Sequence, residues 1–173
     1  MSPPGSAVPN IRVQAEPFDL GAEMAALQER AGTGAGGIGC FVGVVRADSG
    51  SGSAAPLAAL FLEHYPGMTE HALSDIVSDG IRRFGLLACT VVHRVGRLPV
   101  GEPIVLVLTA APHRAAALDA TAFLIDWLKT RAPFWKRQEF ADGTGAWIEA
   151  RDADDRAAAR WDATRDAPER RWN

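Results

Sequence analysis

The chain has 173 residues, 47% of them hydrophobic, which is enough for one sizeable core and too few for two domains. Its 18 basic and 21 acidic side chains give a formal net charge of −3, which argues against a protein that coats nucleic acid or an anionic membrane. No stretch approaches the roughly 18 uncharged apolar residues of a membrane span, and the first ten residues lack the features of a targeting segment, so we expect a cytoplasmic protein.

The first third of the chain predicts a strand, a short helix and a second strand. Residues 1–10 form a flexible lead, and a short strand follows at 11–14. Apolar residues at helical spacing predict a helix over 20–31, with Asp19 placed to cap its first turn. A flexible connection at 32–37 then leads to the next strand.

The second strand, at 38–45, is rich in small and β-branched residues, which predicts burial on both of its faces. It ends at Arg46, and the Gly/Ser-rich stretch 47–56 predicts a mobile loop. Another strand is expected at 57–64, followed by a helix over 68–84 whose apolar positions recur at helical spacing.

Two more strands are expected at 86–95 and 103–110. The segment between them is too short for a crossover helix, so we expect antiparallel neighbours. The longest helix begins at Pro112, and Pro133 ends it at Ala132. Its predicted apolar side contains Leu118, Ala122, Ile125 and Leu128.

The C-terminal part predicts a turn at Asp142 and Gly143 between two extended pieces, the second at 146–150. The charged stretch from Arg151 can form a helix up to Trp161, and we expect a disordered extension over 162–173. Together these elements predict one α+β domain over 11–161, with a mostly antiparallel sheet and two principal helices.

The two lysines of the chain lie close together, although 18 side chains are basic. Lys129 falls in the last turn of the long helix and Lys136 just beyond it, within the unusual run LKTRAPFWKR. An amine can exchange a proton where a guanidinium cannot, so lysine retained among arginines suggests proton transfer. A basic pair on a solvated helix end remains an equal alternative.

A second cationic pair, His113 and Arg114, falls at the N-terminus of the long helix, where backbone amides favour an anion such as phosphate. Arg46 can join the same anion if the sheet brings it near. An exposed or capping His113 is the simpler alternative. His93 and Arg94 lie in an apolar strand, which favours a structural role for both.

The usual hydrolase and metal motifs are missing. There is no GxSxG, CxxC or HExxH, and no spacing of Asp and His typical of a metal site, so we expect no metal. Cys40 and Cys89 each lie inside an apolar run, which favours small buried hydrophobic residues over a disulfide or a sulfur donor.

Several motifs resemble one known family in order and spacing. They are LEHYPGMTEHAL at 62–73, VVHRVG at 91–96, the pair His113 and Arg114, and LKTRAPFWKR at 128–137. Over about residues 10–161 the chain resembles the molybdopterin synthase catalytic subunit family. The resemblance implies an α/β hammerhead fold and a homodimer, each copy of which binds a small ubiquitin-like sulfur carrier.

The resemblance also implies a reaction. The carrier's C-terminal Gly-Gly thiocarboxylate enters the active site, and cyclic pyranopterin monophosphate receives two sulfurs to become the dithiolene of molybdopterin, with no bound cofactor. It makes Lys129 and Lys136 the active-site lysines. It places Arg46, His113 and Arg114 in the phosphate and pterin pocket, part of which the dimer partner can supply.

Two other functions are compatible with the same residues. A module that binds a carrier protein or a phosphorylated ligand without turnover would need the cations but not both lysine amines. A stand-alone enzyme acting on another phosphorylated heterocycle would work without any carrier. An assay with carrier and precursor separates these alternatives.

Overall fold

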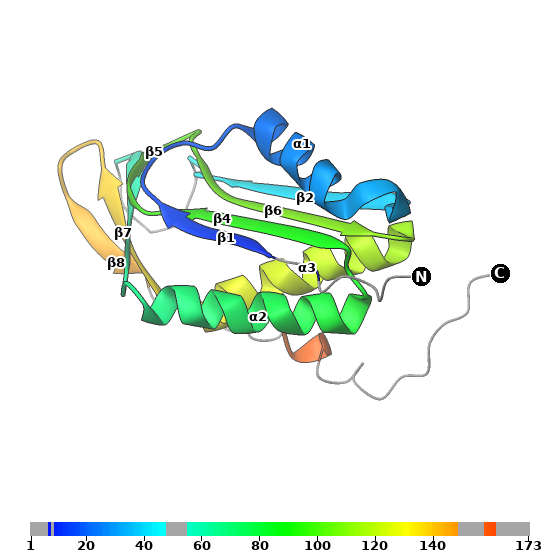
Figure 1. The fold of residues 1–173 in the computed structure, drawn as a ribbon. Helices are drawn as coiled ribbons and strands as arrows, with labels where there is room; N and C mark the ends of the chain where they lie inside the picture. Colours follow the sequence, from blue (N-terminus) through cyan, green and yellow to red (C-terminus); the bar gives the residue numbers. More distant parts are fainter. Residues whose placement is uncertain (1–6, 8, 48–54, 149–157, 162–173) are drawn as a thin grey trace.

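The computed structural model describes residues 7, 9–47, 55–148 and 158–161, which form two four-stranded sheets and three long helices (Figure 1). The helices are α1 (Leu20–Ala31), α2 (Met68–Phe84) and α3 (Arg114–Arg131). Sheet A has the strand order β1 (Asn10–Gln14), β4 (Ala88–Arg94), β6 (Pro103–Ala111) and β2 (Gly37–Val44). Sheet B has the order β5 (Gly96–Pro99), β3 (Leu57–His64), β7 (Phe134–Phe140) and β8 (Gly145–Ile148).

The α+β class with mostly antiparallel strands is confirmed. Within sheet A only β1 and β4 are parallel, and all pairs of sheet B are antiparallel. The sequence predicted one sheet, but the chain leaves β4 and enters sheet B after a single residue, Val95, because 96–99 pairs with β3. That short strand, β5, was not predicted.

Helices cover both faces of sheet A. Figure 1 shows α1 on one face and α2 with α3 on the other. Leu27 of α1 packs with Val92 and Leu106, while Leu73 of α2 packs with Val91 on the opposite face. The two faces therefore bury two separate apolar clusters, and β4 between them is buried along its whole length.

The predicted bounds of α1 and α2 are confirmed. The Asp19 carboxylate accepts a hydrogen bond from the Ala22 amide at 2.9 Å, as an N-cap residue does. Gly85 ends α2 in the left-handed conformation, with φ 61°. The long helix begins at Arg114, two residues later than predicted, because His113 is its N-cap, and it ends before Pro133 as expected.

Three predictions about burial are wrong. The strand at 38–45 was expected to be buried on both faces, but β2 is the edge strand of sheet A, and Cys40 in its middle is exposed. Leu118, on the predicted apolar side of α3, is 59% exposed. α3 packs against both sheet A and α2, so its buried residues form two stripes: Ala117, Ala120, Thr121, Phe123, Leu124, Trp127 and Leu128.

α3 approaches β2 closely because β2 carries glycine at the contact. A Cβ built on Gly39 would lie 2.7 Å from the Ala117 carbonyl oxygen and 2.8 Å from the Thr109 hydroxyl, and closer still to the hydroxyl of Thr121. Thr109 and Thr121 hydrogen-bond each other at 2.8 Å, which ties α3 to β6 as well. The position of α3 beneath β2 and β6 therefore depends on the missing side chain.

The remaining expectations concern loops and ends. Residues 32–34 of the expected flexible connection form a 3-10 turn. Residues 158–161 are helical, within the stretch predicted to form a helix up to Trp161. The expected mobile loop and C-terminal extension lie largely or wholly outside the described residues. Among the residues that the structure describes, no helix is long and apolar enough to cross a membrane.

Candidate active site

A pocket of about 580 Å³ lies where the two sheets meet, beside the C-terminal end of α3. Six elements line it: β2, β3, β4, β6, α3 and β7. Aliphatic and aromatic side chains make up most of its wall, and the cationic side chains are Arg46, Lys129 and Lys136. None of the described residues lining this pocket is acidic. An anion entering it would therefore meet three positive charges and no opposing carboxylate.

Local geometry carries the two lysines to the same pocket. Lys129 lies in the last turn of α3, next to the buried Leu128. Pro133 holds Ala132 in an extended conformation, so the chain turns from the helix directly into β7. Because side chains alternate along a strand, Lys136 points to the same face of β7 as Phe134, and both line the pocket.

Arg46 follows a fixed end of β2. The Val45 amide donates to the Glu102 carbonyl at 2.9 Å, and the Val45 carbonyl accepts from the Gly101 amide at 2.8 Å. The Val45 side chain is 1% exposed. These contacts hold the backbone just before Arg46, and Arg46 contributes to the pocket wall.

His93 forms part of the same wall, between the two sheets. Its ring stacks on Phe134 with centroids 3.8 Å apart, and its Nδ1 lies 2.9 Å from the Arg94 carbonyl oxygen. A carbonyl can only accept, so Nδ1 carries the proton and Nε2 is the acceptor nitrogen. Burial lowers the pKa of His93 to about 4; the charges of Lys136 and His64 also lower it, whereas the Arg94 carbonyl raises it. The ring is therefore neutral near pH 7.

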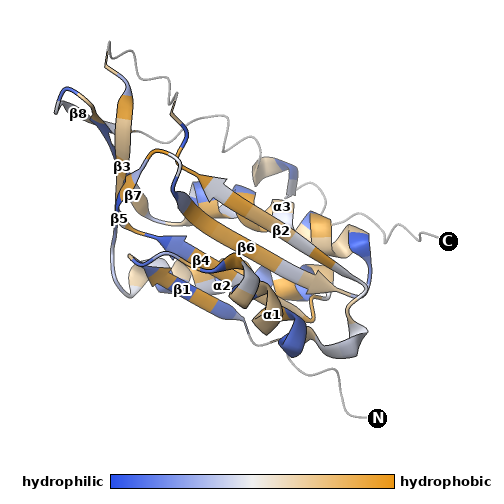
Figure 2. Cartoon of the chain, turned by 90° about the horizontal axis from the view of Figure 1, so that it is seen from above, coloured by the Kyte–Doolittle hydropathy of each residue, from blue (hydrophilic) through white to orange (hydrophobic). Residues whose placement is uncertain are grey.

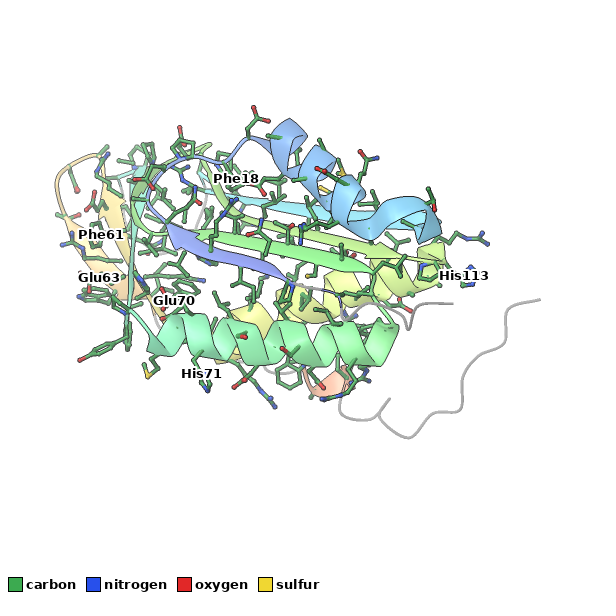
Figure 3. All side chains as sticks on the ribbon, viewed as in Figure 1. Phe18, Phe61, Glu63, Glu70, His71 and His113 are labelled. Atoms are coloured by element: carbon green, nitrogen blue, oxygen red, sulfur yellow. The ribbon has the colours of Figure 1, made fainter. Side chains whose placement is uncertain are left out.

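His113 and Arg114 lie elsewhere. Arg114 precedes Lys129 by 15 residues of continuous helix, which places them about 22 Å apart along the axis of α3. In Figure 3, His113 lies at the end of the molecule opposite to Phe61 and Glu63 of sheet B. Both residues are exposed, and His113 makes no capping bond with its side chain. The anion site suggested for Arg46, His113 and Arg114 together does not form within one chain.

The pocket suits an extended, uncharged chain segment that ends in an anion. Its apolar wall can accept the segment, the cations can hold the terminal charge, and the lysine amines can exchange protons there. Metal chemistry has no comparable site: in the described part of the chain, no three His, Cys, Asp or Glu side chains are grouped as metal ligands.

Comparison with known protein families shows which family this chain belongs to. The family model of the MoaE protein matches residues 13–131. The chain belongs to the MoaE family. A molybdopterin synthase catalytic subunit from Rhizobium meliloti is 49% identical over 152 residues, which cover 87% of this chain and 94% of the relative.

Solved structures of MoaE-family proteins share the fold. The molybdopterin biosynthesis MoaE protein from Burkholderia ambifaria matches with a TM-score of 0.75 and 46% identity, over 90% of this chain and 99% of that one. A complex of subunits 1 and 2 of the molybdopterin-converting factor from Helicobacter pylori contains a chain that matches with a TM-score of 0.63 over 84% of this chain and 92% of its own. At 22% identity, that match shows the fold alone.

In this MoaE-family chain, three of the five site residues predicted from the sequence line one pocket: Arg46, Lys129 and Lys136. His93 lines the same pocket and was not predicted as a site residue. The sequence favoured a structural role for His93 and Arg94. For Arg94 this is confirmed, since its buried guanidinium donates to the Glu102 carboxylate at 2.8 Å and the Pro103 carbonyl at 2.9 Å. His93 is buried as well, but it also lines the pocket. The one sequence signal was a histidine in an otherwise apolar strand.

Proposed function

We propose that this chain is the catalytic subunit of a molybdopterin synthase. It transfers sulfur from the thiocarboxylated C-terminus of a small ubiquitin-like carrier subunit to cyclic pyranopterin monophosphate, which forms the dithiolene of molybdopterin. The observation that carries the proposal is the pocket at the end of α3, where two lysines and one arginine meet an apolar wall in a MoaE-family chain.

The cysteines support an external sulfur donor. Cys89 is fully buried in sheet A, and burial raises the pKa of its thiol to about 12. Cys40 is exposed, but it lies on β2 outside the pocket wall. A thiolate of either residue is thus poorly placed to reach a substrate beside Lys129. Sulfur that a carrier brings on its C-terminal tail is neither buried in sheet A nor held outside the pocket.

The pocket wall favours such a tail. A Gly-Gly terminus has no side chains, so it can follow the apolar wall and place its thiocarboxylate among the three cations. The Helicobacter pylori protein that shares this fold is found in a complex of subunits 1 and 2 of its molybdopterin-converting factor. As each C–S bond forms on the precursor a C–O bond of the precursor breaks, and water cleaves the acyl–sulfur bond so that the carrier leaves as a carboxylate. An adjacent amine can donate or accept the proton that each of these steps moves.

A second copy of the chain completes the site in this proposal. One helix cannot bring Arg114 to Lys129, because Lys129 lies 15 positions further along α3. A partner subunit can present its own His113 and Arg114 to the phosphate of the precursor. The active species is then a homodimer with one carrier on each copy, a heterotetramer.

The decisive assay mixes the purified chain with thiocarboxylated carrier and precursor, and follows the dithiolene product. Carrier with an ordinary carboxylate is the matched control. Product from thiocarboxylated carrier alone supports the proposal. Absence of product would favour a binding module without turnover, and conversion of a phosphorylated heterocycle without carrier would favour a stand-alone enzyme.

Replacing each lysine by arginine tests its role, because arginine keeps the positive charge but cannot exchange a proton near neutral pH. Lys129→Arg should fold, dimerise and bind carrier, yet turn over at least about a hundredfold more slowly, the usual contribution of a proton-transferring group. Lys136→Arg is the comparison. Lys136 lies inside β7, between Leu62 and Ile148 on its neighbours, so it is held as firmly as Lys129. Near-normal turnover by Lys129→Arg would leave that residue a purely electrostatic role.

The shared site is tested by mixing two defective proteins. Lys129→Ala and Arg114→Ala homodimers should each have low activity at limiting precursor. After exchange of subunits, half of the dimers are mixed, and each mixed dimer has one intact site. Activity should return to about a quarter of the wild-type value. If the mixture stays as inactive as its components, both residues serve the same subunit. Normal activity of the Arg114→Ala homodimer by itself would mean that Arg114 has no part in the site.

A further inference from the structure

His93 carries a hydrogen-bond acceptor that no other described side chain of the pocket wall has. The cationic side chains Arg46, Lys129 and Lys136 have donors only, and the other described lining side chains are aliphatic or aromatic. The imidazole of His93 is neutral near pH 7, so one of its nitrogens keeps a lone pair. A ligand that brings N–H groups into the pocket therefore meets one described side chain that can accept from it.

The protein fixes the orientation of the His93 ring. Nδ1 donates to the Arg94 carbonyl oxygen at 2.9 Å, and the ring stacks on Phe134 with an interplanar angle of 14°. Phe134 is held in turn by β7, where it pairs with His64 of β3. Because both the plane of the ring and one of its edges are fixed, the second nitrogen, Nε2, points in one direction.

The Nε2 atom of His93 is open to the pocket. It has no hydrogen-bond partner among the described residues, and yet it is not one of their fully buried side-chain atoms without a partner, which are the Nε atoms of Arg12 and Arg137. Nε2 therefore keeps some accessible surface, although only 7% of the residue is exposed. His93 is part of the pocket wall, so this surface faces the pocket. A buried side chain with one open acceptor is arranged to receive a donor.

We propose that Nε2 of His93 accepts a hydrogen bond from a backbone N–H of the carrier's Gly-Gly tail, and so positions the thiocarboxylate in the pocket. The inference rests on the proposed function in one respect, because it takes that tail as the ligand. It adds a contact to the peptide groups of the tail, which the three cations cannot supply.

The tail needs an acceptor because of its own chemistry. Each glycine of the tail has one backbone N–H donor and one carbonyl or terminal acceptor. The lysines and Arg46 can donate to the carbonyls and to the thiocarboxylate, but they cannot accept from the N–H groups. An N–H left without a partner against an apolar wall would weaken binding at least about fivefold.

The place of His93 favours the tail over the pterin. In sheet A, β6 lies between β4 and β2, so His93 is two strands, about 10 Å, from the strand that leads to Arg46. Figure 2 shows β4 and β6 side by side between β1 and β2, mostly in the colour of hydrophobic residues. The family resemblance assigns Arg46 to the phosphate and pterin, which puts that ligand on the β2 side.

On its own side of the pocket, His93 lies beside β7. Its ring touches Phe134, and the charge of Lys136, two residues further along the same face of β7, is close enough to lower the pKa of His93. A thiocarboxylate held by Lys136 therefore brings the adjacent peptide groups of the tail to His93.

A double-mutant cycle on binding isolates this contact. The carrier, in its ordinary carboxylate form, is made by chemical ligation with an ester in place of one glycine amide of the tail at a time, which removes one N–H and changes the shape little. Each carrier is titrated by calorimetry against the wild type, His93→Phe and His93→Asn. At one of the two positions the ester should weaken binding to the wild type about tenfold.

The two variants lose the acceptor and differ in what they keep. His93→Phe keeps a ring against Phe134, and His93→Asn keeps an N–H for the Arg94 carbonyl. Both should bind the all-amide carrier about tenfold more weakly than the wild type does, and the ester should weaken neither of them further. A substitution that acts only by disturbing the fold would instead leave the tenfold ester effect in place, and that result in both variants would overturn the proposal.

Leu60→Ala is the matched control, because Leu60 lines the same pocket and has no polar side-chain atom. It should keep the full ester effect of the wild type. Titration with the precursor alone separates the two ligands: His93→Phe should bind it as the wild type does, and a tenfold loss there, with the ester effect retained, would assign Nε2 to the pterin and overturn the proposal. None of these measurements uses sulfur transfer. A chain that shows the cycle but makes no dithiolene would contradict only the proposed function, as would a wild type that binds no carrier.

Discussion

His93 should make the folded protein sensitive to acid. Its pKa is about 4 in the folded chain, because the ring is buried, and about 6.5 when unfolded. As the pH falls below 6.5, the unfolded chain binds a proton at this position before the folded chain does. Protonation therefore favours unfolding, and the loss of stability continues down to pH 4, where it reaches about 3 kcal/mol. Between pH 8 and pH 5 the loss is about 2 kcal/mol.

The assay is urea unfolding at pH 8 and at pH 5, for the wild type and for His93→Gln at one protein concentration. Glutamine is polar and can donate to the Arg94 carbonyl, but it does not titrate. Each protein is compared with itself, so any cost of the substitution cancels. The variant should lose about 2 kcal/mol less than the wild type between the two pH values. Equal losses would mean that the ring is protonated as readily in the folded chain as in the unfolded one.

Two further predictions concern the framework around the site. Gly39→Ala should lower the free energy of unfolding by about 3 kcal/mol, since its Cβ would collide with α3. Gly34→Ala, whose Cβ would meet Leu87 at 3.4 Å, is the control that should remain near wild type in the same urea titration. Arg94→Met should cost about 2 to 3 kcal/mol, because the buried guanidinium loses its hydrogen bonds to Glu102 and Pro103. Arg97→Met, which removes an ion pair of a half-exposed arginine, should change thermal stability little, and equal effects of the two arginine variants would contradict the importance given to burial.

The buried face of a helix could be predicted from sequence where only one side of that helix is buried. α2 contacts the rest of the chain mainly along one stripe, and its apolar spacing gave both of its ends. α3 has two buried sides, so its buried residues do not follow one stripe, and spacing selected Leu118 although that residue is exposed. Periodicity reports which residues are apolar, and it does not report which of them another element covers.

The site could be predicted only in parts. Lys129 and Lys136 are close in sequence and meet across a proline-terminated helix, which local rules describe. Arg46 lines the same pocket as the lysines because of the way sheet A meets sheet B. That arrangement depends on β5, a four-residue strand whose sequence has almost no hydrophobic pattern. His93 reaches the pocket for the same reason. Contacts between sheets are long-range, and sequence spacing carries little information about them.

The length of α3 has a consequence for how this chain can vary. Each residue added to or removed from a helix turns everything beyond it by about 100° and moves it by about 1.5 Å. A single insertion between Arg114 and Lys129 would swing one end of the helix away from β2 and expose residues that now face α2. Loops at the surface can gain or lose residues at little cost. The number of residues between the two cationic ends of α3 is therefore constrained. It can change without rotating one end away from its contacts only by about whole turns of the helix.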